Sequence, residues 1–333
     1  MKLLGQNDVD KNLFASMTVA VVGYGSQGRA QALNLRDSGV KVLLGLREGG
    51  ASWALAKRDG WTPMPIAKAV AAADLTAVLV PDMCQGALFA DEIAPNLSDG
   101  AAVLFAHGFA VHYGQVTAPD NVDVVLIAPK SPGGLVRRQY VEGYGVPCLY
   151  AVHKDAGGDA AARALAYAHG IGGTRAGVLQ TTFAEETETD LFGEQAVLCG
   201  GVTELVTAGF DTLVSAGYQP EIAYFECLHE LKLIVDLLHE GGLERLHKDV
   251  SETARWGDMT CGPVVVDRGT RTRMATVLSQ IQDGTFAKRW IDEDRAGRPN
   301  YNRLMEADLA HPIERVGKKL RARMPWLSGG GSK

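Results

Sequence analysis

The sequence predicts an N-terminal α/β domain with a doubly wound parallel sheet, followed by an all-helical C-terminal domain. Three observations predict this. Short apolar runs alternate with helical stretches through residues 18–150, a glycine-rich turn follows the first run, and strand-like runs nearly vanish after residue 181. We therefore place the domains at residues 1–181 and 182–327, and expect the glycine-rich tail 328–333 to be flexible.

The strands of the first domain are predicted from runs that are mostly apolar throughout, as expected for strands covered on both faces. The predicted strands are residues 18–22, 41–45, 76–80, 101–105, 122–128 and 146–152. A last helix is predicted over 156–169, before a turn at 170–173.

Long helical patterns fill the second domain. The predicted helices are residues 191–210, 220–240, 250–256, 271–283 and 303–324. The stretch 220–240 is apolar almost all round, which predicts a buried helix. Pro220 suits its first turn, and Gly241-Gly242 is expected to end it.

Composition excludes several classes of protein. A net charge of −6 provides no basic footprint for nucleic acid. No uninterrupted apolar run approaches the ~20 residues of a membrane span, and the first residues lack the apolar core of a secretory signal. Five dispersed cysteines without CxxC spacing indicate reduced thiols and a cytoplasmic protein.

The turn after residues 18–22 has the pattern Gly-x-Gly-x-x-Gly and opens a helix, which is the context of a Rossmann dinucleotide site. Gly23 permits the tight turn, Gly25 lets the backbone approach a pyrophosphate, and Gly28 allows close packing of helix on strand. The free N–H groups of the helix would bind the phosphates. The candidate cofactor residues of this turn are Gly23, Tyr24, Gly25, Ser26, Gln27 and Gly28. The alternative is a tight turn in another α/β fold.

The loop after the second strand is expected to hold the adenosine ribose. Arg47 and Ser52 suit a 2′-phosphate, whereas Glu48 suits a free 2′-hydroxyl. The alternative is a solvated loop with one charge of each sign.

Two carboxylate pairs predict a metal site. Asp190 and Glu194, and likewise Glu226 and Glu230, are spaced i, i+4 and would share one helix face. Buried carboxylates must be neutralised, and hard oxygen ligands suit Mg²⁺. Four carboxylates exceed what one Mg²⁺ takes from protein, so two ions are expected.

Simpler explanations exist for both stretches. A helix N-terminus alone accounts for Glu185, Glu186 and Glu188, because its dipole favours acids. Glu226 and Glu230 would otherwise pair with a cation such as Lys232.

Taken together, these residues resemble ketol-acid reductoisomerase of the short, class I type, over residues 2–327. The stretches that carry the resemblance are 23–40, 105–116, 128–133, 185–201, 216–243 and 251–258. The resemblance implies a Rossmann domain, a knotted helical domain, and a homodimer with a shared active site that can form a higher oligomer. It also implies two Mg²⁺ ions held by Asp190 and Glu194 of one subunit and by Glu226 and Glu230 of the other.

The implied reaction is an alkyl migration in 2-acetolactate or 2-aceto-2-hydroxybutyrate, followed by reduction with NAD(P)H to 2,3-dihydroxy-3-methyl acids of valine and isoleucine biosynthesis. By the resemblance, Lys130 lies near the reacting oxygens, His107 lies beside the nicotinamide, and Glu194 is a candidate for proton transfer. Ser251 would hold the substrate carboxylate, with Cys199 near the same pocket.

Each of these residues also has a structural explanation. His107 could be a turn histidine, Lys130 a surface lysine, Ser251 a helix N-cap and Cys199 a packing residue. Asp82 and Gly133 complete the candidate cofactor residues.

The sequence departs from the family near the cofactor. Arg29 stands where histidine is frequent, Met83 where an acid is common, Gly50 where a phosphate-binding serine is common, and Ser131 begins a stretch that is usually Gly-Pro-Gly-His. NADPH is the family default, but Gly50 and Glu48 predict that NADH is also used or preferred.

Two other functions are compatible with parts of the pattern. A metal-free β-hydroxyacid dehydrogenase would share the two-domain layout but would not need Glu226 and Glu230. A catalytically silent NAD(P)-binding regulator would be expected to lack a metal ligand, and none of the four is missing.

Overall fold

The structure, a computed structural model, describes residues 3–327. Contacts divide the chain into two compact units, Met1–Thr189 and Asp190–Lys333. This division falls inside helix α10 (Phe183–Gly193), whereas the predicted boundary at residue 181 falls just before that helix. The tail predicted at residues 328–333 lies outside the described residues.

The first unit is built on an eight-stranded sheet, which confirms the predicted α/β class. The strands, in chain order, are β1 (Leu3–Leu4), β2 (Thr18–Val22), β3 (Lys41–Gly45), β4 (Leu75–Val78), β5 (Ala102–Phe105), β6 (Asp123–Pro129), β7 (Cys148–Lys154) and β8 (Val178–Gln180). Their order across the sheet is β1-β8-β7-β6-β5-β4-β2-β3.

The sheet is mixed, which corrects the expectation of an all-parallel sheet. The strands β3, β2, β4, β5 and β6 are parallel to one another, but β7 runs antiparallel to β6, and β1 runs antiparallel to β8. The six predicted strands are present, the first two with the predicted bounds. The short edge strands β1 and β8 were not predicted.

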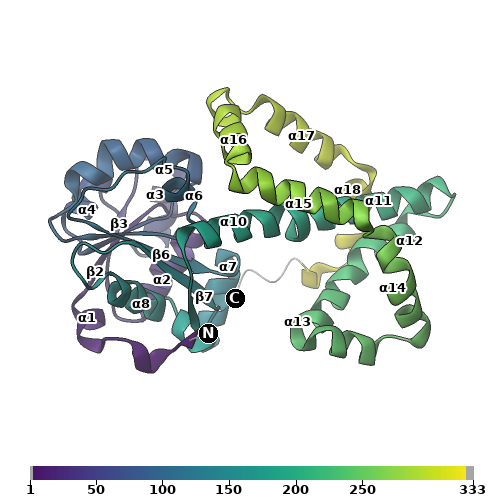
Figure 1. The fold of residues 1–333 in the computed structure, drawn as a ribbon, viewed down its shortest axis with the longest axis horizontal. Coiled ribbons are helices and arrows are strands. Elements are labelled where there is room, and N and C mark those ends of the chain that lie inside the picture. Colours follow the sequence, from purple (N-terminus) through teal and green to yellow (C-terminus); the bar gives the residue numbers. More distant parts are fainter. Residues whose placement is uncertain (1–2, 328–333) are drawn as a thin grey trace. The chain divides into compact units, whose positions relative to one another are not determined.

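Helices cover both faces of this sheet (Figure 1). They are η1 (Gln6–Asp8), α1 (Lys11–Ser16), α2 (Ser26–Asp37), α3 (Ala51–Arg58), α4 (Ile66–Ala71), α5 (Asp82–Leu88), the π-turn η2 (Phe89–Ile93), η3 (Ala94–Asn96), α6 (Phe109–His112), α7 (Gly133–Val141), α8 (Ala160–Gly170) and α9 (Gly173–Ala176). Helices α1, α2 and α8 lie on one face and α4, α5 and α6 on the other (Figure 1).

The two faces have separate apolar cores, because alternate residues of a strand point to opposite sides. Val19 and Val21 of β2 pack with Leu35 of α2, whereas Val22 packs with the cluster that contains Phe89 and Phe105. Since β2 is buried on both faces, its carboxyl end is a rigid support for the turn that follows.

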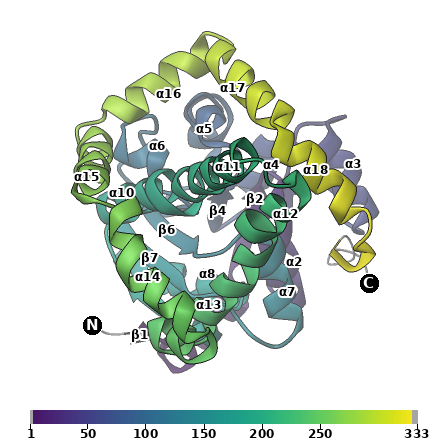
Figure 2. The same ribbon diagram turned by 90° about the vertical axis from the view of Figure 1, so that its right-hand side faces the viewer.

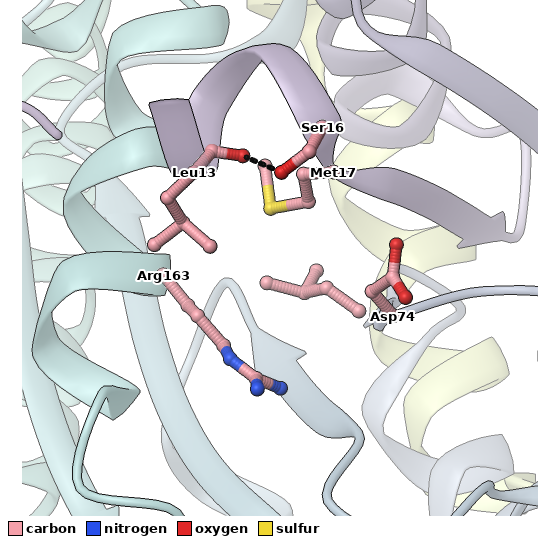
Figure 3. Close-up of a pocket in the computed structure, with 6 residues that line it drawn as sticks. Leu13, Ser16, Met17, Asp74 and Arg163 are labelled. Atoms are coloured by element: carbon pink, nitrogen blue, oxygen red, sulfur yellow. Dashed lines mark hydrogen bonds between the residues drawn. The ribbon is translucent and has the colours of Figure 1, made fainter. Parts of the chain in front are cut away.

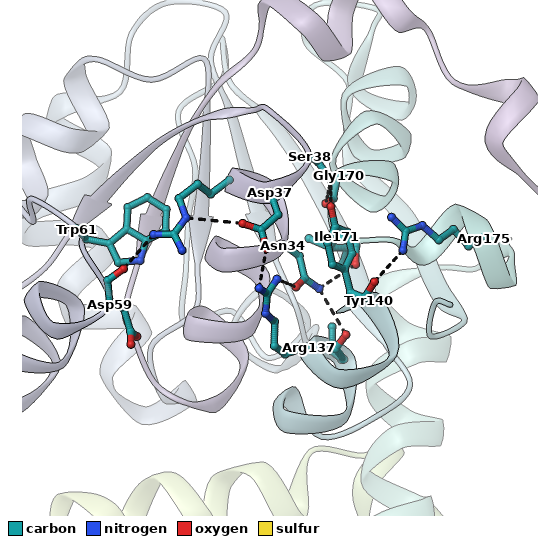
Figure 4. Close-up of polar contacts among 12 residues, drawn as sticks. Asn34, Asp37, Ser38, Asp59, Trp61, Arg137, Tyr140, Gly170, Ile171 and Arg175 are labelled. Atoms are coloured by element: carbon teal, nitrogen blue, oxygen red, sulfur yellow. Dashed lines mark hydrogen bonds and ion pairs between the residues drawn. The ribbon is translucent and has the colours of Figure 1, made fainter. Parts of the chain in front are cut away.

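Polar side chains join α2 to α7 (Figure 4). Arg137 donates to Asn34 Oδ1 at 2.9 Å and pairs with Asp37 at 2.6 Å. Asn34, which is fully buried, donates in turn to the backbone oxygens of Val136 and Ile171. The middle of α7 is thereby fixed to the helix that follows the glycine-rich turn.

The second unit is helical within its described residues, as predicted. Its elements after α10 are the π-turn η4 (Glu194–Leu198), α11 (Gly200–Ser215), α12 (Pro220–Tyr224), the π-turn η5 (Phe225–His229), α13 (Glu230–Asp249), α14 (Glu252–Val265), α15 (Arg268–Gln282), α16 (Thr285–Arg295), α17 (Pro299–Ala310), α18 (Pro312–Arg321) and η6 (Pro325–Leu327). Figure 2 shows α13 to α17 following one another along an open path. The knot implied by the resemblance stays a prediction.

Several predicted helices differ in detail. The stretch 303–324 is two helices, because Pro312 starts α18 after a break at His311. Helix α16 was not predicted. Gly241 and Gly242 have non-helical backbone angles, so the helix kinks at the pair that was expected to end it.

The expectation of a buried helix over 220–240 is wrong within a single chain. Ala223 and Tyr224 are buried, where α12 packs against α11 and α18, but α13 has no buried residue. Leu233 is 53% exposed and Val235 is 47% exposed. The apolar composition therefore indicates a surface that its own chain does not cover.

Both helices with candidate metal ligands contain a π-turn. Glu194 begins η4. Glu226 lies within η5, and this π-turn ends directly before Glu230. A π-turn takes in one more residue than an α-turn, so residues four apart across η5 lie more nearly above one another than in an α-helix. Such turns are frequent at functional sites.

One continuous helical stretch, Phe183–Ser215, is long and apolar enough to cross a membrane by length and composition, since an 18-residue window within it has a mean hydropathy of 1.4. Carboxylates interrupt it, so the sequence shows no unbroken apolar run of that length. A single such helix is weak evidence for a membrane span, and a helix that packs against other protein has the same composition.

Candidate active site

The glycine-rich turn follows β2 and has the geometry of a dinucleotide site. Gly23 has a φ of 101°, and a Cβ there would lie 2.7 Å from the carbonyl oxygen of Leu79. A Cβ on Gly28 would lie 2.3 Å from the carbonyl oxygen of Gly23, whereas a Cβ on Gly25 would meet nothing within 4 Å. Gly23 and Gly28 are therefore required for packing, and Gly25 leaves the approach to the N-terminus of α2 open.

Tyr24 of this turn points into the protein. Its hydroxyl donates to Asp59 Oδ2 at 2.9 Å and accepts from Trp61 Nε1 at 2.8 Å. Arg29 forms two hydrogen bonds with the same carboxylate, and these hold the pKa of Asp59 below its usual range despite its partial burial. A cofactor can thus meet only the backbone of Tyr24, and Arg29 is engaged with Asp59.

Gln27 and Gly133 join the glycine-rich turn to the start of α7. Gln27 Nε2 donates to the carbonyl oxygen of Ser131 at 2.8 Å. A Cβ on Gly133 would lie 2.2 Å from the carbonyl oxygen of Ser26, so the two segments touch through their backbones. Only glycine fits at residue 133, and Gly133 stays a cofactor candidate through its backbone alone.

The ribose loop lies between β3 and α3. Arg47 and Glu48 are exposed, Gly49 has a φ of 74°, and Gly50 is the N-cap residue of α3 without a side-chain hydrogen bond. Ser52 is the second residue of α3. Both charges are therefore available to a bound ribose.

Asp82 begins α5 after β4, at the carboxyl edge of the parallel strands. Its Oδ1 accepts from Gln85 Nε2 at 3.2 Å, and the same amide donates to the carbonyl oxygen of Val80 at 3.0 Å. Gln85 thus stabilises the turn that presents Asp82.

Glu186 is the centre of a buried polar cluster at the start of α10. Its side chain is 1% exposed. Oε1 accepts from Lys130 Nζ at 2.8 Å, while Oε2 accepts from the backbone N–H of Gly108 at 3.0 Å and lies 3.2 Å from His107 Nδ1. Burial acts to raise the pKa of Glu186, but His107 and Lys130 outweigh it and hold the pKa below its usual range. Glu186 is therefore an anion that orients both candidate catalytic side chains.

The sequence interpretation missed Glu186, since a helix dipole sufficed to explain it. The available signal was its spacing: Glu186, Asp190 and Glu194 follow one another at i, i+4. Within residues 3–327, one group of possible metal ligands has its atoms within 4.8 Å of one another, namely His107, Glu186 and Asp190.

The four predicted metal ligands do not come together in one chain, judged over residues 3–327. Asp190 is partly buried, whereas Glu194, Glu226 and Glu230 are exposed. The expected burial of Glu226 and Glu230 is thus wrong for the single chain. Their oxygens nevertheless form a donor set that suits a hard cation.

Ser251 and Cys199 are both exposed, and each is the N-cap residue of a helix. Ser251 Oγ accepts from the backbone N–H of Ala254 at 3.1 Å and caps α14, as the structural alternative predicts. Cys199 precedes α11, directly after η4. All five cysteines are free thiols, as predicted.

A separate cavity of about 260 Å³ lies at the opposite edge of the sheet, where β2 and β4 begin (Figure 3). It is lined by Leu13, Ser16, Met17, Asp74, Leu75 and Arg163. Arg163 already pairs with Asp159 at 3.0 Å and donates to the carbonyl oxygen of Gly100. Ligands of such sheets bind at the carboxyl ends of the strands, so this cavity is not part of the candidate site.

The fold and the site define a dinucleotide-dependent oxidoreductase whose helical second unit carries the candidate metal ligands. A family model described as acetohydroxy acid isomeroreductase, NADPH-binding domain, matches residues 13–177, and one described as ketol-acid reductoisomerase, C-terminal domain, matches residues 183–326. The chain belongs to the ketol-acid reductoisomerase family and is an isomeroreductase of branched-chain amino-acid biosynthesis.

Similar proteins span almost the whole chain. Ketol-acid reductoisomerase (NADP(+)) of Xylella fastidiosa strain 9a5c is 59% identical over 318 residues, covering 96% of this chain and 91% of its own. The protein of the same name from Xanthomonas axonopodis pv. citri is 60% identical over 311 residues, covering 93% of each. A solved NADH-preferring ketol-acid reductoisomerase from an uncultured archean has a TM-score of 0.94 at 42% identity, covering 97% of this chain and 99% of its own.

Proposed function

We propose that the chain converts 2-acetolactate and 2-aceto-2-hydroxybutyrate into 2,3-dihydroxy-3-methyl acids, with Mg²⁺ and a nicotinamide cofactor. The observation that carries this proposal is the cluster in which Lys130 and His107 are held by the buried carboxylate of Glu186, one helical turn before Asp190. This cluster brings an ammonium group and an imidazole to the start of the helix that carries two candidate metal ligands.

In this proposal Asp190 and Glu194 hold two Mg²⁺ ions together with Glu226 and Glu230 of a second copy of the chain. The ions supply polarisation of the substrate ketone and of its tertiary hydroxyl, which alkyl migration requires. Carboxylate oxygens are the ligands that Mg²⁺ prefers, and the exposure of three of the four leaves them accessible to it.

The side chains of the chain itself have distinct roles. Lys130 Nζ, held by Glu186, would donate a hydrogen bond to the reacting oxygens, and the carboxylate of Glu194 would accept the proton that the tertiary hydroxyl loses. His107, fixed by the same carboxylate, would lie beside the nicotinamide. Ser251 holds the substrate carboxylate, and Cys199 lines the same pocket.

The shared site requires a homodimer, which we propose as the minimal assembly. Large apolar side chains are exposed along consecutive helices of the second unit: Leu205, Ile222, Phe225, Leu233, Val235, Leu243, Trp256 and Met259. So large an apolar surface indicates a protein interface. We propose that a second copy, and not lipid, covers it and the apolar helix Phe183–Ser215, in a cytoplasmic protein that binds no nucleic acid.

Cofactor choice is the finer part of the proposal. We propose that NADH is used well or preferred, because Glu48 is exposed beside the expected ribose site and can accept from a 2′-hydroxyl. Both patterns occur among the relatives: the two that are about 60% identical are named for NADP(+), and the solved structure at 42% identity is of an NADH-preferring enzyme.

The test is oxidation of NADH and of NADPH, measured in parallel with 2-acetolactate and Mg²⁺. Turnover that stops when Mg²⁺ is chelated and returns when it is restored supports the proposal. Turnover that survives complete chelation would favour the metal-free β-hydroxyacid dehydrogenase instead. A protein that binds the cofactor but turns over neither acetohydroxy acid would be the silent regulator.

A further inference from the structure

A chain of hydrogen bonds, fully buried at its Tyr167 end and partly buried beyond it, runs from α8 to the segment that carries Lys130. The hydroxyl of Tyr167 donates to Gln31 Oε1 at 2.7 Å, and Gln31 Nε2 donates to Gln27 Oε1 at 2.9 Å. Gln27 Nε2 then donates to the carbonyl oxygen of Ser131 at 2.8 Å. Tyr167 and Gln31 are both 0% exposed. We call these three side chains the Tyr167 relay.

The hydrogen bonds of the Tyr167 relay can be donated in only one direction along the chain of side chains. The carbonyl oxygen of Ser131 can only accept, so Gln27 must present its amide N–H₂ to it. Gln27 Oε1 then requires a donor, which is Gln31 Nε2, and Gln31 Oε1 requires the hydroxyl of Tyr167. If either amide were reversed, two acceptors would face each other in a partly or fully buried place, which is costly. The carbonyl oxygen of Ser131 therefore sets the orientation of both amides, and Gln31 and Tyr167 hold Gln27 in that orientation by satisfying its Oε1 and the Oε1 of Gln31.

The relay ends at the candidate catalytic segment. Ser131 follows Lys130, and its N–H donates to the carbonyl oxygen of Pro129 at 2.9 Å. The N–H of Lys130 donates to the carbonyl oxygen of Pro147, which fixes the other side of the turn to the start of β7. The side chain of Gln27 is thus the polar link between the glycine-rich turn and the Lys130 turn.

Backbone contact alone does not set the distance between the glycine-rich turn and the Lys130 turn. Gly133 and Ser26 touch without a side chain on Gly133, and such a contact limits approach but not sliding. A directional hydrogen bond does fix the register of two segments. Arg137 and Asn34 join α7 to α2 farther along both helices, so the bond from Gln27 to Ser131 is the one that acts at the turn itself. Cofactor phosphates at the N-terminus of α2 would therefore be held at the closest-defined distance from Lys130 while Gln27 holds Ser131.

We propose that Gln27, Gln31 and Tyr167 are positioning residues, which align the bound cofactor with the Lys130 centre by fixing the Lys130–Ser131 turn against the glycine-rich turn. The inference rests on the proposed role of Lys130. It assigns Gln27 a function through Ser131, beyond any contact of its own with the cofactor.

The test compares Gln31→Leu, Tyr167→Phe and the double variant with the parent. Hydrogen exchange of backbone amides in residues 129–136, measured without cofactor or substrate, reports directly on the turn. We expect Gln31→Leu to speed that exchange by at least about fivefold, because Gln27 loses the donor that orients it. We expect kcat to fall by about tenfold while the Kd for cofactor changes by less than about threefold.

The double variant separates positioning from stability. Gln31→Leu alone leaves the buried hydroxyl of Tyr167 without an acceptor, which lowers Tm, and removing that hydroxyl as well restores much of Tm. If the relay positions the turn, the double variant recovers Tm but neither kcat nor slow exchange. If kcat and exchange recover together with Tm, the relay is only structural and the inference is wrong.

Two further variants complete the comparison. Thr76→Val removes another buried hydroxyl, one that makes no hydrogen bond in the structure, and should keep parental kcat and parental exchange at 129–136. Lys130→Met tests the proposed function by itself. If it abolishes turnover while Gln31→Leu alters neither exchange nor kcat, the relay fails and the function of Lys130 stands. If Lys130→Met is fully active, the proposed role fails first.

Discussion

Lys130 Nζ donates to Glu186 Oε1 at 2.8 Å, and the two residues are 56 positions apart in the sequence. The lysine side chain is 34% exposed, whereas the carboxylate is 1% exposed. The buried, charged carboxylate of Glu186 therefore holds the ammonium group of Lys130 at the surface of the site. A neutral support would hold that ammonium group less strongly.

Replacing Glu186 tests this support. Glu186→Gln keeps the shape of the side chain but removes the charge shared by Lys130 and His107, so we expect kcat to fall by about 10²-fold, in the range of misplaced acid–base groups. Steady-state kinetics with 2-acetolactate measures this. Glu185→Gln is the matched control, because Glu185 is exposed and accepts from Thr181 Oγ1 on the same helix turn. Equal activity of the two variants would contradict a role for Glu186.

The strands of the first unit were predictable because burial on both faces makes them apolar throughout. Residues 18–22 and 41–45 match β2 and β3 at both ends. Direction was not predictable from such runs, since an apolar strand reads the same either way along a sheet. The antiparallel β7 therefore came only from the structure.

Sequence spacing located the metal-site helices but not their local form. A π-turn has no characteristic residue type, so the i, i+4 pattern did not indicate η4 or η5. The apolar helix over 220–240 was expected to be buried, and the pattern holds no information on which chain covers it. Glu186 was missed because its partners, His107 and Lys130, come from distant segments.

The Tyr24–Asp59–Arg29 contacts predict a loss of stability in acid. Arg29 and Tyr24 hold the pKa of Asp59 below its ordinary 3.8, so the carboxylate is favoured in the folded protein. Its contribution is complete above pH 3.8 and is lost as the pH falls below that value. We expect Asp59→Asn to lower the free energy of unfolding by about 1–2 kcal/mol at neutral pH, and by less in acid.

Urea unfolding at a series of pH values from neutral to below 3.8 measures the difference between the parent and Asp59→Asn. Asp99→Asn is the control, since Asp99 lies at an exposed position and accepts from the side chain of Asn121. A difference between the parent and Asp59→Asn that stays constant into acid would show that the charge of Asp59 does not contribute.

The shared site predicts complementation between inactive chains. Asp190→Asn and Glu230→Gln should each be inactive alone, because each homodimer has two defective sites. In a mixed dimer one site has both defects and the other has neither. If exchange is random, half the dimers are mixed, so we expect about a quarter of the parental activity per chain.

The matched control mixes Asp190→Asn with Glu194→Gln. Both residues are contributed to a site by the same subunit in this proposal, so no mixed dimer contains an intact site and no activity should return. Recovery in the control, or none in the first mixture after subunit exchange is verified by mass spectrometry, would argue that each site is built within one chain.

The ribose loop makes the last prediction, on cofactor choice. Arg47 can pair with the 2′-phosphate of NADPH, but Glu48 places a like charge beside it, and Gly50 offers no hydroxyl at the N-cap of α3. The repulsion and the attraction act over similar distances in an exposed loop, where salt screens both. For NADH, Glu48 instead accepts from the ribose hydroxyl.

We expect kcat/KM for the two cofactors to differ by less than about tenfold, or to favour NADH. Glu48→Ser should move the ratio toward NADPH, because it removes the repulsion and adds a donor, whereas Glu92→Ser, at another exposed acid of the same unit, should leave the ratio unchanged. A parent that favours NADPH by about a hundredfold, with no change in Glu48→Ser, would show that Arg47 alone decides and that Glu48 faces solvent.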